Sequence, residues 1–430
     1  MFDSREYAWA AWHLIHDGVY SQEPVAGPVA PALGREPLFP AVVAGMLGVL
    51  PGLDGISTDC LSLGKGCGYQ AWRPALFFNG VFIGLTGVSV FLIVMLLGAG
   101  RLAAWLGGLH VWLNGEAARG REYLLSDHLA LLLVALASLA SLWAYRRGGG
   151  RWLVAGAAFA ALTLTKAVFL WLVAPALAAA LIGILLRSPN RARALTAWAL
   201  FAVAYAAPVG SWMERNHAVG GTYALTMGRS ATALSTREVF DHMTPPQYAA
   251  AFVYWTRAMG DGLAKKYFPA DVWRPFEIDN PNGFYLIGQH RLTPEMTALV
   301  ANGTPPATAE KMLESRMIAA ILDRPLAFAA STLPLIWRGI WVDEFIVLSL
   351  PALIWLAWIA AFRRRPDVAL AIGPGAFSLV FYALVSLNIP RYQLTAVPAL
   401  AVAFGIGIAT IVTALRARRG TRAQRSAAPS

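Results

Sequence analysis

Two carboxylates and four cations stand beside apolar runs in this chain, at positions where they could act together. The carboxylates are Asp3 and Asp127. The cations are Arg35, Lys166, Arg215 and Arg391. A positioned carboxylate can take a proton from a nucleophile, whereas arginine binds phosphate through two hydrogen bonds and lysine acts as a point charge. This combination indicates proton transfer beside an anionic ligand such as a lipid phosphate.

The two carboxylates also have structural interpretations. Asp3 is typical of a helix N-cap, a role that is compatible with action as a base. Asp127, which is followed by His128, opens an apolar run and can be a solvated span end. Ionisable groups at membrane depth cost about 2.5–3.5 kcal/mol or more, so Asp127 and His128 are also functional candidates.

The cations have structural alternatives as well. Lys166 lies between two apolar stretches and can extend its amine to the interface. Arg215 and Arg391 can each anchor a helix end. The topology derived below places these three and Arg35 on the outer face, opposite to the usual bias of basic residues toward the cytoplasm. Charge topology therefore does not explain them, whereas an anionic ligand does.

The composition predicts an all-α polytopic membrane protein. Hydrophobic residues make up 57% of the chain and charged residues 14%, and mean hydropathy is +0.53; soluble proteins carry about 25% charged residues. The 16 Trp and 13 Tyr suit two membrane–water interfaces. The net charge of +11 does not indicate nucleic-acid binding, because the arginines cluster in short blocks between apolar runs.

Apolar runs that cross or nearly cross about 30 Å of hydrocarbon recur along the chain. Nine spans are predicted: 73–98, 101–114, 123–145, 152–165, 167–186, 194–212, 345–362, 367–387 and 393–415. With nine spans every basic block falls on one side, which the positive-inside bias makes cytoplasmic. These blocks are Arg146–Arg147 with Arg151, Arg187 with Arg191 and Arg193, Arg363–Arg365, and the arginines of the C-terminal tail.

The spans divide the chain into five regions. They are an external loop over 1–72, spans over 73–212, an external segment over 213–343, spans over 344–415 and a basic cytoplasmic tail over 416–430. The external side would be the periplasmic side of a bacterial inner membrane. A 72-residue loop with no preceding span suggests that a first helix is missing, through a misplaced start or a truncated sequence; a natural protein with an external N-terminus is the alternative.

Further helices are predicted in the external regions. A helix over 3–17, with Tyr7 on its apolar face, suits the interface plane, and an apolar helix over 38–50 is too short to span. Three more are expected later: near 246–266, near 307–322 and over 325–342. Cys60 and Cys67 share the first loop, where the compartment permits a disulfide; two unpaired thiols are the alternative.

The first loop contains three spaced elements. A D-x-x-x-Y-x-x-x-A pattern falls at Asp3, Tyr7 and Ala11, a G-x-Y element at Gly18 and Tyr20, and an R-x-P-x-F-P element at Arg35, Pro37, Phe39 and Pro40. Downstream come Ser126–Asp127, Leu164–Thr165–Lys166, Trp212 with Arg215 and Asn216, and Arg391–Tyr392. The order of these elements resembles the GT-C glycosyltransferases that use dolichyl- or polyprenyl-phosphate sugars. That group includes protein mannosyltransferases and lipid A aminoarabinose transferases, and the resemblance runs from residue 3 to about 415, with Asp127 in place of the usual glutamate.

The resemblance implies a GT-C-like bundle and a transfer reaction at the external face. The donor would be a polyprenyl-phosphate sugar and the acceptor a glycan, lipid or protein, with inversion at the anomeric carbon. Asp3 would be the general base, and Arg391, Arg215, Lys166 and Arg35 would stabilise the leaving phosphate. Tyr7 and Tyr392 would contact substrate. Some relatives use a divalent metal ion, which Asp3 and Asp127 would hold here.

Two other functions fit a chain of this class. A transporter or flippase for a lipid-linked or anionic substrate predicts ionisable groups near the bilayer midplane, and often duplicated halves, neither of which is visible here. A non-catalytic membrane subunit would present the 213–343 segment to partners. The sugar and the acceptor are not determined by the sequence.

Overall fold

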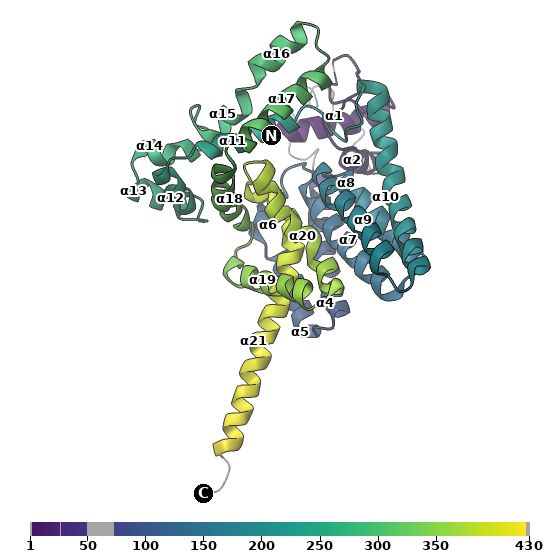
Figure 1. Ribbon diagram of the computed structural model, residues 1–430, viewed down its shortest axis with the longest axis vertical. Coiled ribbons are helices and arrows are strands. Elements are labelled where there is room, and N and C mark those ends of the chain that lie inside the picture. The colour runs from purple at the N-terminus through teal and green to yellow at the C-terminus, as the bar shows by residue number, and fades with distance from the viewer. Residues whose placement is uncertain (1, 26, 50–72, 427–430) are drawn as a thin grey trace.

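The computed structural model describes residues 2–25, 27–49 and 73–426, and these residues form helices and no β-strand (Figure 1). Among them, six helical stretches are long and apolar enough to cross a membrane. They are Phe77–Leu97 in α4 (Arg73–Leu97), α7 (Asp127–Arg147), η2 and α9 (Ala167–Phe169 and Leu170–Arg187), α10 (Arg191–Gly220), α20 (Pro366–Val385), and η5 with α21 (Pro390–Ala396 and Val397–Ser426). The prediction of an all-α polytopic membrane protein is confirmed. Cys60 and Cys67 lie outside the described residues.

Three of the nine predicted spans are shorter helices. Residues 101–114, 152–165 and 345–362 correspond to α5 (Arg101–Trp112), α8 (Arg151–Thr163) and α19 (Ile346–Phe362). Helices of 12, 13 and 17 residues reach only about 18–26 Å, which is less than the ~30 Å of hydrocarbon. All three nevertheless pack within the bundle, α5 against α4 and α21, α8 against α7 and α10, and α19 against α20 and α21.

Helix α7 is the centre of the bundle. Its Leu129 and Val134 belong to one hydrophobic core, which also contains side chains of α1 (Phe2–His16), α2 (Leu38–Val49) and α8. Its Leu131 and Leu142 belong to a second core, built with α4, α5 and α19 to α21. Because protein surrounds α7 on both sides, the residue that begins it, Asp127, is held in a fixed position.

Glycines allow α5 and α21 to approach closely. A Cβ atom on Gly405 would lie 2.3 Å from the carbonyl oxygen of Ala103, and one on Gly107 would lie 3.0 Å from that of Ala401. Close contact through small residues is typical of membrane bundles, in which van der Waals packing drives helix association. The first half of α21 is thereby fixed in the bundle, and its second half extends away from it (Figure 1).

The helix ends form two groups. Arg146, near the end of α7, lies 3.9 Å from Asp367 at the start of α20, so the basic ends of these helices meet. The helices α1 and α2 and the segment between α10 and α19 lie at the opposite end (Figure 1). This arrangement separates the arginine blocks from the polar residues that were predicted to do chemistry.

The two helices of the first loop pack onto that opposite end. Helix α1 buries Tyr7 and Ala11, as predicted for its apolar face, whereas Ile15 is exposed. The backbone N–H of Leu38, at the start of α2, donates to the carbonyl of Leu164 at 3.0 Å. This hydrogen bond joins the R-x-P-x-F-P turn to the segment that carries Lys166.

The segment between α10 and α19 consists of short helices. The predicted helices near 307–322 and 325–342 are α17 (Pro306–Leu322) and α18 (Pro325–Ile340), which meet at 96°. The stretch predicted near 246–266 divides into α12 (Pro245–Tyr254) and α13 (Gly260–Tyr267), because Ala258 between them has a left-handed φ of 65°. The remaining helices are α6 (Gly115–Gly120), α11 (Ser230–Val239), η3 (Phe240–His242), α14 (Ala270–Trp273), η4 (Arg274–Phe276), α15 (Phe284–His290) and α16 (Thr293–Ala301).

A buried arginine attaches this segment to the bundle. Arg237 of α11 donates to the Asp241 carboxylate at 2.6 Å, to the carbonyl of Ala383 in α20 at 2.9 Å and to the carbonyl of Phe328 in α18 at 2.8 Å. The side chains of Arg237 and Asp241 are both fully buried. Helix α11 is therefore fixed against the end of α20 by a compensated charge.

Replacing Gly405 with alanine tests the contact between α5 and α21. The added Cβ would meet backbone that cannot rotate away, so we expect a loss of about 1–3 kcal/mol in the free energy of unfolding. Thermal unfolding of the purified protein in detergent measures it. Gly183→Ala in α9 is the matched control, because a Cβ there meets nothing within 4 Å; equal unfolding temperatures for the two variants would contradict the close packing.

Candidate functional site

Two cations converge on Asp127 at the end of the bundle opposite to the basic blocks. The Lys166 Nζ atom lies 2.7 Å from Asp127 Oδ1, and the Arg391 Nε atom lies 3.5 Å from Oδ2. The Asp127 side chain is 4% exposed, while those of Lys166 and Arg391 are 18% and 22% exposed. These three side chains form an ion cluster of one negative and two positive charges, and the Glu36 carboxylate also lies close enough to interact with Lys166.

Local structure explains how three distant segments supply these groups. Asp127 is the first residue of α7, where the N-terminal end of the helix dipole favours a carboxylate. Lys166 precedes η2 in an extended conformation, with φ −143° and ψ 102°, which turns its side chain out of the helical path. Arg391 follows Pro390, whose fixed φ suits the first turn of η5.

The Asp127 carboxylate keeps Lys166 protonated. Burial alone would lower the pKa of the Lys166 amine, but the combined effect of Asp127, Tyr382, Tyr7 and Glu36 is larger, so the pKa lies above its ordinary range. A raised lysine pKa contributes stability that is fully present below about pH 10.4 and is lost only as pH rises through the folded-state pKa. The cation is therefore permanent at physiological pH.

Residues of the first loop lie beside the ion cluster. The Tyr7 hydroxyl is 3.1 Å from the Ser126 hydroxyl, next to Asp127, and burial raises the pKa of the Tyr7 phenol. The Arg35 guanidinium stacks 5.0 Å from the Tyr7 ring, and its Nε donates to Glu6 at 2.6 Å. The predicted proximity of Tyr7, Arg35 and Lys166 is thus present in the structure, with Glu6 as an additional partner.

Glu36 is a residue of this region that the sequence analysis missed. Its carboxylate accepts a hydrogen bond from the backbone N–H of Ala167 at 2.9 Å, at the start of η2. It therefore satisfies a helix N-terminus one residue after Lys166. Its position between Arg35 and Pro37, within the R-x-P-x-F-P element, was the sequence feature that could have identified it.

Two tyrosines extend the site along α20 and η5. The rings of Tyr382 and Tyr392 lie 5.5 Å apart, and Arg391 stacks 5.5 Å from the Tyr392 ring. The Tyr382 hydroxyl is close enough to interact electrostatically with Lys166 and Asp127. Tyr392 was predicted, whereas Tyr382 was missed because it lies within an apolar span with no polar neighbour in sequence.

Arg215 lies apart from the ion cluster. It donates to the carbonyl of Ala32 at 2.6 Å and stacks 4.8 Å from Trp212 and 5.7 Å from Tyr20. Its neighbour Asn216 donates to two backbone carbonyls, those of Ala224 and Leu225. The W-x-x-R-N element thus fixes the loop that carries Arg35, and in the described residues it makes no contact with Asp127, Lys166 or Arg391.

The predicted metal site does not fit Asp127. Both of its carboxylate oxygens face cations, and the described residues contain no group of three His, Cys, Asp or Glu side chains that could hold a metal. The side chain of Asp3 lies outside the described part of the chain, so its predicted role stays a prediction. His128 is held structurally, with Nε2 2.9 Å from the carbonyl of Ala117.

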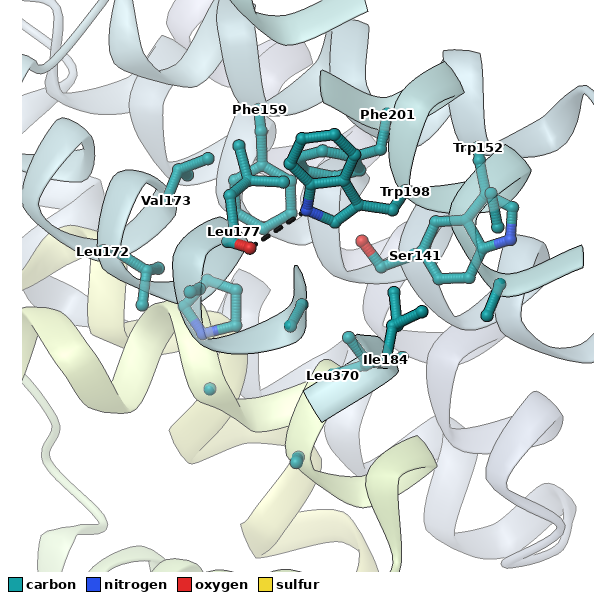
Figure 2. A pocket seen from close by; sticks show the side chains of 17 residues that line it. Ser141, Trp152, Phe159, Leu172, Val173, Leu177, Ile184, Trp198, Phe201 and Leu370 are labelled. Atoms are coloured by element: carbon teal, nitrogen blue, oxygen red, sulfur yellow. Dashed lines mark hydrogen bonds between the residues drawn. The ribbon is translucent and has the colours of Figure 1, made fainter. Parts of the chain in front are cut away.

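An apolar cavity of about 520 Å³ lies within the bundle that carries the ion cluster. It is lined from α7, α8, α9, α10 and α20, with Ser141, Trp152, Phe159, Leu172, Val173, Leu177, Ile184, Trp198, Phe201 and Leu370 labelled in Figure 2. Leu172 follows Lys166 by six residues, which is roughly 9 Å along the chain axis. The Ser141 hydroxyl is buried and has no hydrogen-bond partner among the described residues.

Comparisons with known proteins give one similar solved structure. No protein-family model matches the chain, and no curated protein matches it. The crystal structure of ArnT from Cupriavidus metallidurans in the apo state is similar with 13% identity and a TM-score of 0.34, covering 94% of this chain and 73% of that one. A TM-score this low does not establish a shared fold, so the function has to follow from the side chains of this chain.

Asp127→Asn tests whether the ion cluster is a compensated buried charge. Loss of the carboxylate leaves two cations unpaired, so we expect a loss of up to about 3–5 kcal/mol in the free energy of unfolding. Adding Lys166→Met should restore a large part of it, and denaturant unfolding in detergent measures both. Glu295→Gln, which breaks an exposed pair with Arg316, should cost about 1 kcal/mol or less. An Asp127→Asn protein as stable as this control would refute the cluster.

Proposed function

We propose that the protein is a membrane glycosyltransferase that moves a sugar from a polyprenyl-phosphate donor to an acceptor at the external face of the membrane. The observation that carries this proposal is the pair of cations, Lys166 and Arg391, at the end of a bundle that also contains an apolar cavity. A ligand with an anionic head and a long apolar tail matches both features. Lipid-linked phosphate sugars have this chemistry.

The distances support one ligand that occupies both places. Lys166 and Leu172 are joined by η2 and the first turn of α9, and Asp127 and Ser141 lie on α7 at a separation of about 21 Å. A phosphate at Lys166 would therefore lie roughly 9 Å, measured along the chain axis, from Leu172 in the cavity lining. The cavity would hold part of the tail, with bilayer lipid around the rest.

In the proposed reaction, an acceptor hydroxyl attacks the anomeric carbon of the donor sugar. The new carbon–oxygen bond forms as the bond to the phosphate oxygen breaks, and that electron pair stays on the departing polyprenyl phosphate. Negative charge grows on this phosphate in the transition state, where fixed cations are most effective because they need no reorganisation. Lys166 and Arg391 supply them, and a single displacement inverts the anomeric centre.

The proton of the acceptor goes to a carboxylate, for which we propose Asp3. Asp127 is a poor base because Lys166 and Arg391 stabilise its charged form. Asp3 precedes Tyr7 by four residues on α1, and residues at this spacing share a helix face. Tyr7 contacts Ser126, so this face of α1 is the one that meets the site.

A transporter or flippase is the alternative function. Transporter sites lie near the bilayer midplane, between repeated halves. The ion cluster lies instead at the ends of α7, η2 and η5, where it can meet a water-soluble acceptor. This position favours the transferase.

Asp3→Asn tests the proposed base. It removes the proton acceptor at nearly constant shape, so we expect transfer from a polyprenyl-phosphate sugar to fall by about 10²–10⁴-fold with normal expression and membrane insertion. The assay is the cell-envelope glycan profile of a deletion strain complemented with wild type or variant, followed by transfer with the purified chain. Wild-type transfer by Asp3→Asn would remove Asp3 from the mechanism.

Arg391→Ala tests the phosphate contact separately. Loss of a charged hydrogen bond of about 1.5–3 kcal/mol should weaken donor binding by roughly 10–100-fold, measured by equilibrium binding of radiolabelled polyprenyl phosphate. Arg316→Ala is the matched control, because Arg316 is half-exposed on α17 and pairs with Glu295 far from the cluster in sequence. Equal donor affinity in both variants would make Arg391 a helix anchor and nothing more.

A further inference from the structure

Arg338, on α18, is a partly buried arginine whose charge has no carboxylate partner in the described residues. Its guanidinium stacks 4.9 Å from the ring of Trp255 and donates one hydrogen bond, of 3.3 Å, to the carbonyl of Leu387. No Asp or Glu of the described chain lies within ion-pair distance of it. Most of its five N–H donors are therefore available to another group.

Two other arginines of this protein with little exposure are paired with carboxylates. Arg237 pairs with Asp241 and donates to two further backbone carbonyls and to Thr332, and Arg35 pairs with Glu6. Sequestering a charge without a partner costs several kcal/mol. Arg338 is partly buried and has no carboxylate partner in the described residues, so its guanidinium can bind an anion.

Several possible hydrogen-bond donors lie near Arg338, and the carboxylates of Glu277 and Asp261 lie close enough to interact with one of them, Tyr254. The hydroxyls of Tyr254, Tyr285 and Tyr392 lie close enough to interact electrostatically with its charge. The indole N–H of Trp255 is buried, with 8% of the residue exposed, and has no hydrogen-bond partner. Guanidinium and indole groups only donate, and phenols can donate. Such a set matches a ligand rich in acceptor atoms, above all an oxyanion.

This cluster adjoins the proposed transfer site. Tyr392 directly follows Arg391, and its ring contacts that of Tyr382, which interacts with Lys166 and Asp127. Helix α18 packs against α20, η5 and α12, on the side of the bundle where the short helices lie (Figure 1). Two tyrosines therefore separate Arg338 from the ion cluster.

We propose that Arg338, with Trp255 and the three tyrosines, forms a second anion-binding site that holds a phosphate-class oxyanion of the acceptor. The site is separate from the cation pair that would hold the donor phosphate. It fixes the acceptor at its charged end and leaves a hydroxyl to approach the donor across Tyr392 and Tyr382. Only the naming of the ligand as the acceptor rests on the proposed function.

Equilibrium dialysis of the purified full-length chain in detergent, with radiolabelled inorganic phosphate, tests this site. We expect two phosphates per wild-type chain, one per chain for Arg338→Gln and one for Arg391→Ala. If the donor site is wrong and the Arg338 site is right, wild type binds one phosphate and Arg338→Gln binds none. Unchanged stoichiometry in Arg338→Gln overturns the inference.

Arg338→Lys keeps the test valid if Arg338→Gln fails to fold. Lysine retains the charge but not the planar fork of donors, so we expect the second phosphate to bind at least tenfold more weakly at an unchanged unfolding temperature. Wild-type affinity in Arg338→Lys would overturn the assignment. Adding phosphatidic acid, with phosphatidylcholine as the control, identifies the source: displacement of the second phosphate assigns a lipid headgroup, and its retention assigns a soluble phosphate.

Discussion

The electrostatic compensation of Asp127 is the constraint on which the rest of this structure depends. A carboxylate that is 4% exposed at the end of a central helix stays charged only if cations reach it, because an unpaired charge away from water is costly. Lys166 and Arg391 lie 39 and 264 residues after Asp127 in the sequence. The order of helices around α7 must therefore bring the turn before η2 and the start of η5 to the same point.

The first loop is coupled to this point through backbone hydrogen bonds as well as side chains. Glu36 accepts from Ala167, and Leu38 donates to Leu164, so the turn that carries Lys166 cannot move independently of α2. Tyr7 adds a contact from α1 to Ser126. Helix α1 therefore packs beside the start of α7 and contributes Tyr7 to the surroundings of Asp127.

Sequence predicted the membrane class, the location of the long helices and most of the polar residues that meet, because hydropathy and the cost of ionisable groups in membranes act locally. It did not predict which charges pair. Arg215 was grouped with Lys166 by topology, yet the rotation of α10 directs it to Ala32 and Trp212. Tyr382 carried no local signal, and the break at Ala258 depends on tertiary packing, since alanine favours helix. Pairing, rotation and tertiary strain are properties of the assembled bundle.

The distribution of charge gives the site a direction. At the ion cluster two cations contact one carboxylate. A phosphate that bound there would meet cations that are already ordered, so the free-energy cost of ordering their side chains would be small. At Arg338 the guanidinium has aromatic neighbours and one backbone carbonyl. An anion bound at Arg338 would form a stronger charged hydrogen bond, because the local polarity is low. An anion at the ion cluster would compete with Asp127 for the two cations. The two places thus differ in charge: the cations of the ion cluster already share the Asp127 carboxylate, whereas Arg338 has no carboxylate partner in the described residues.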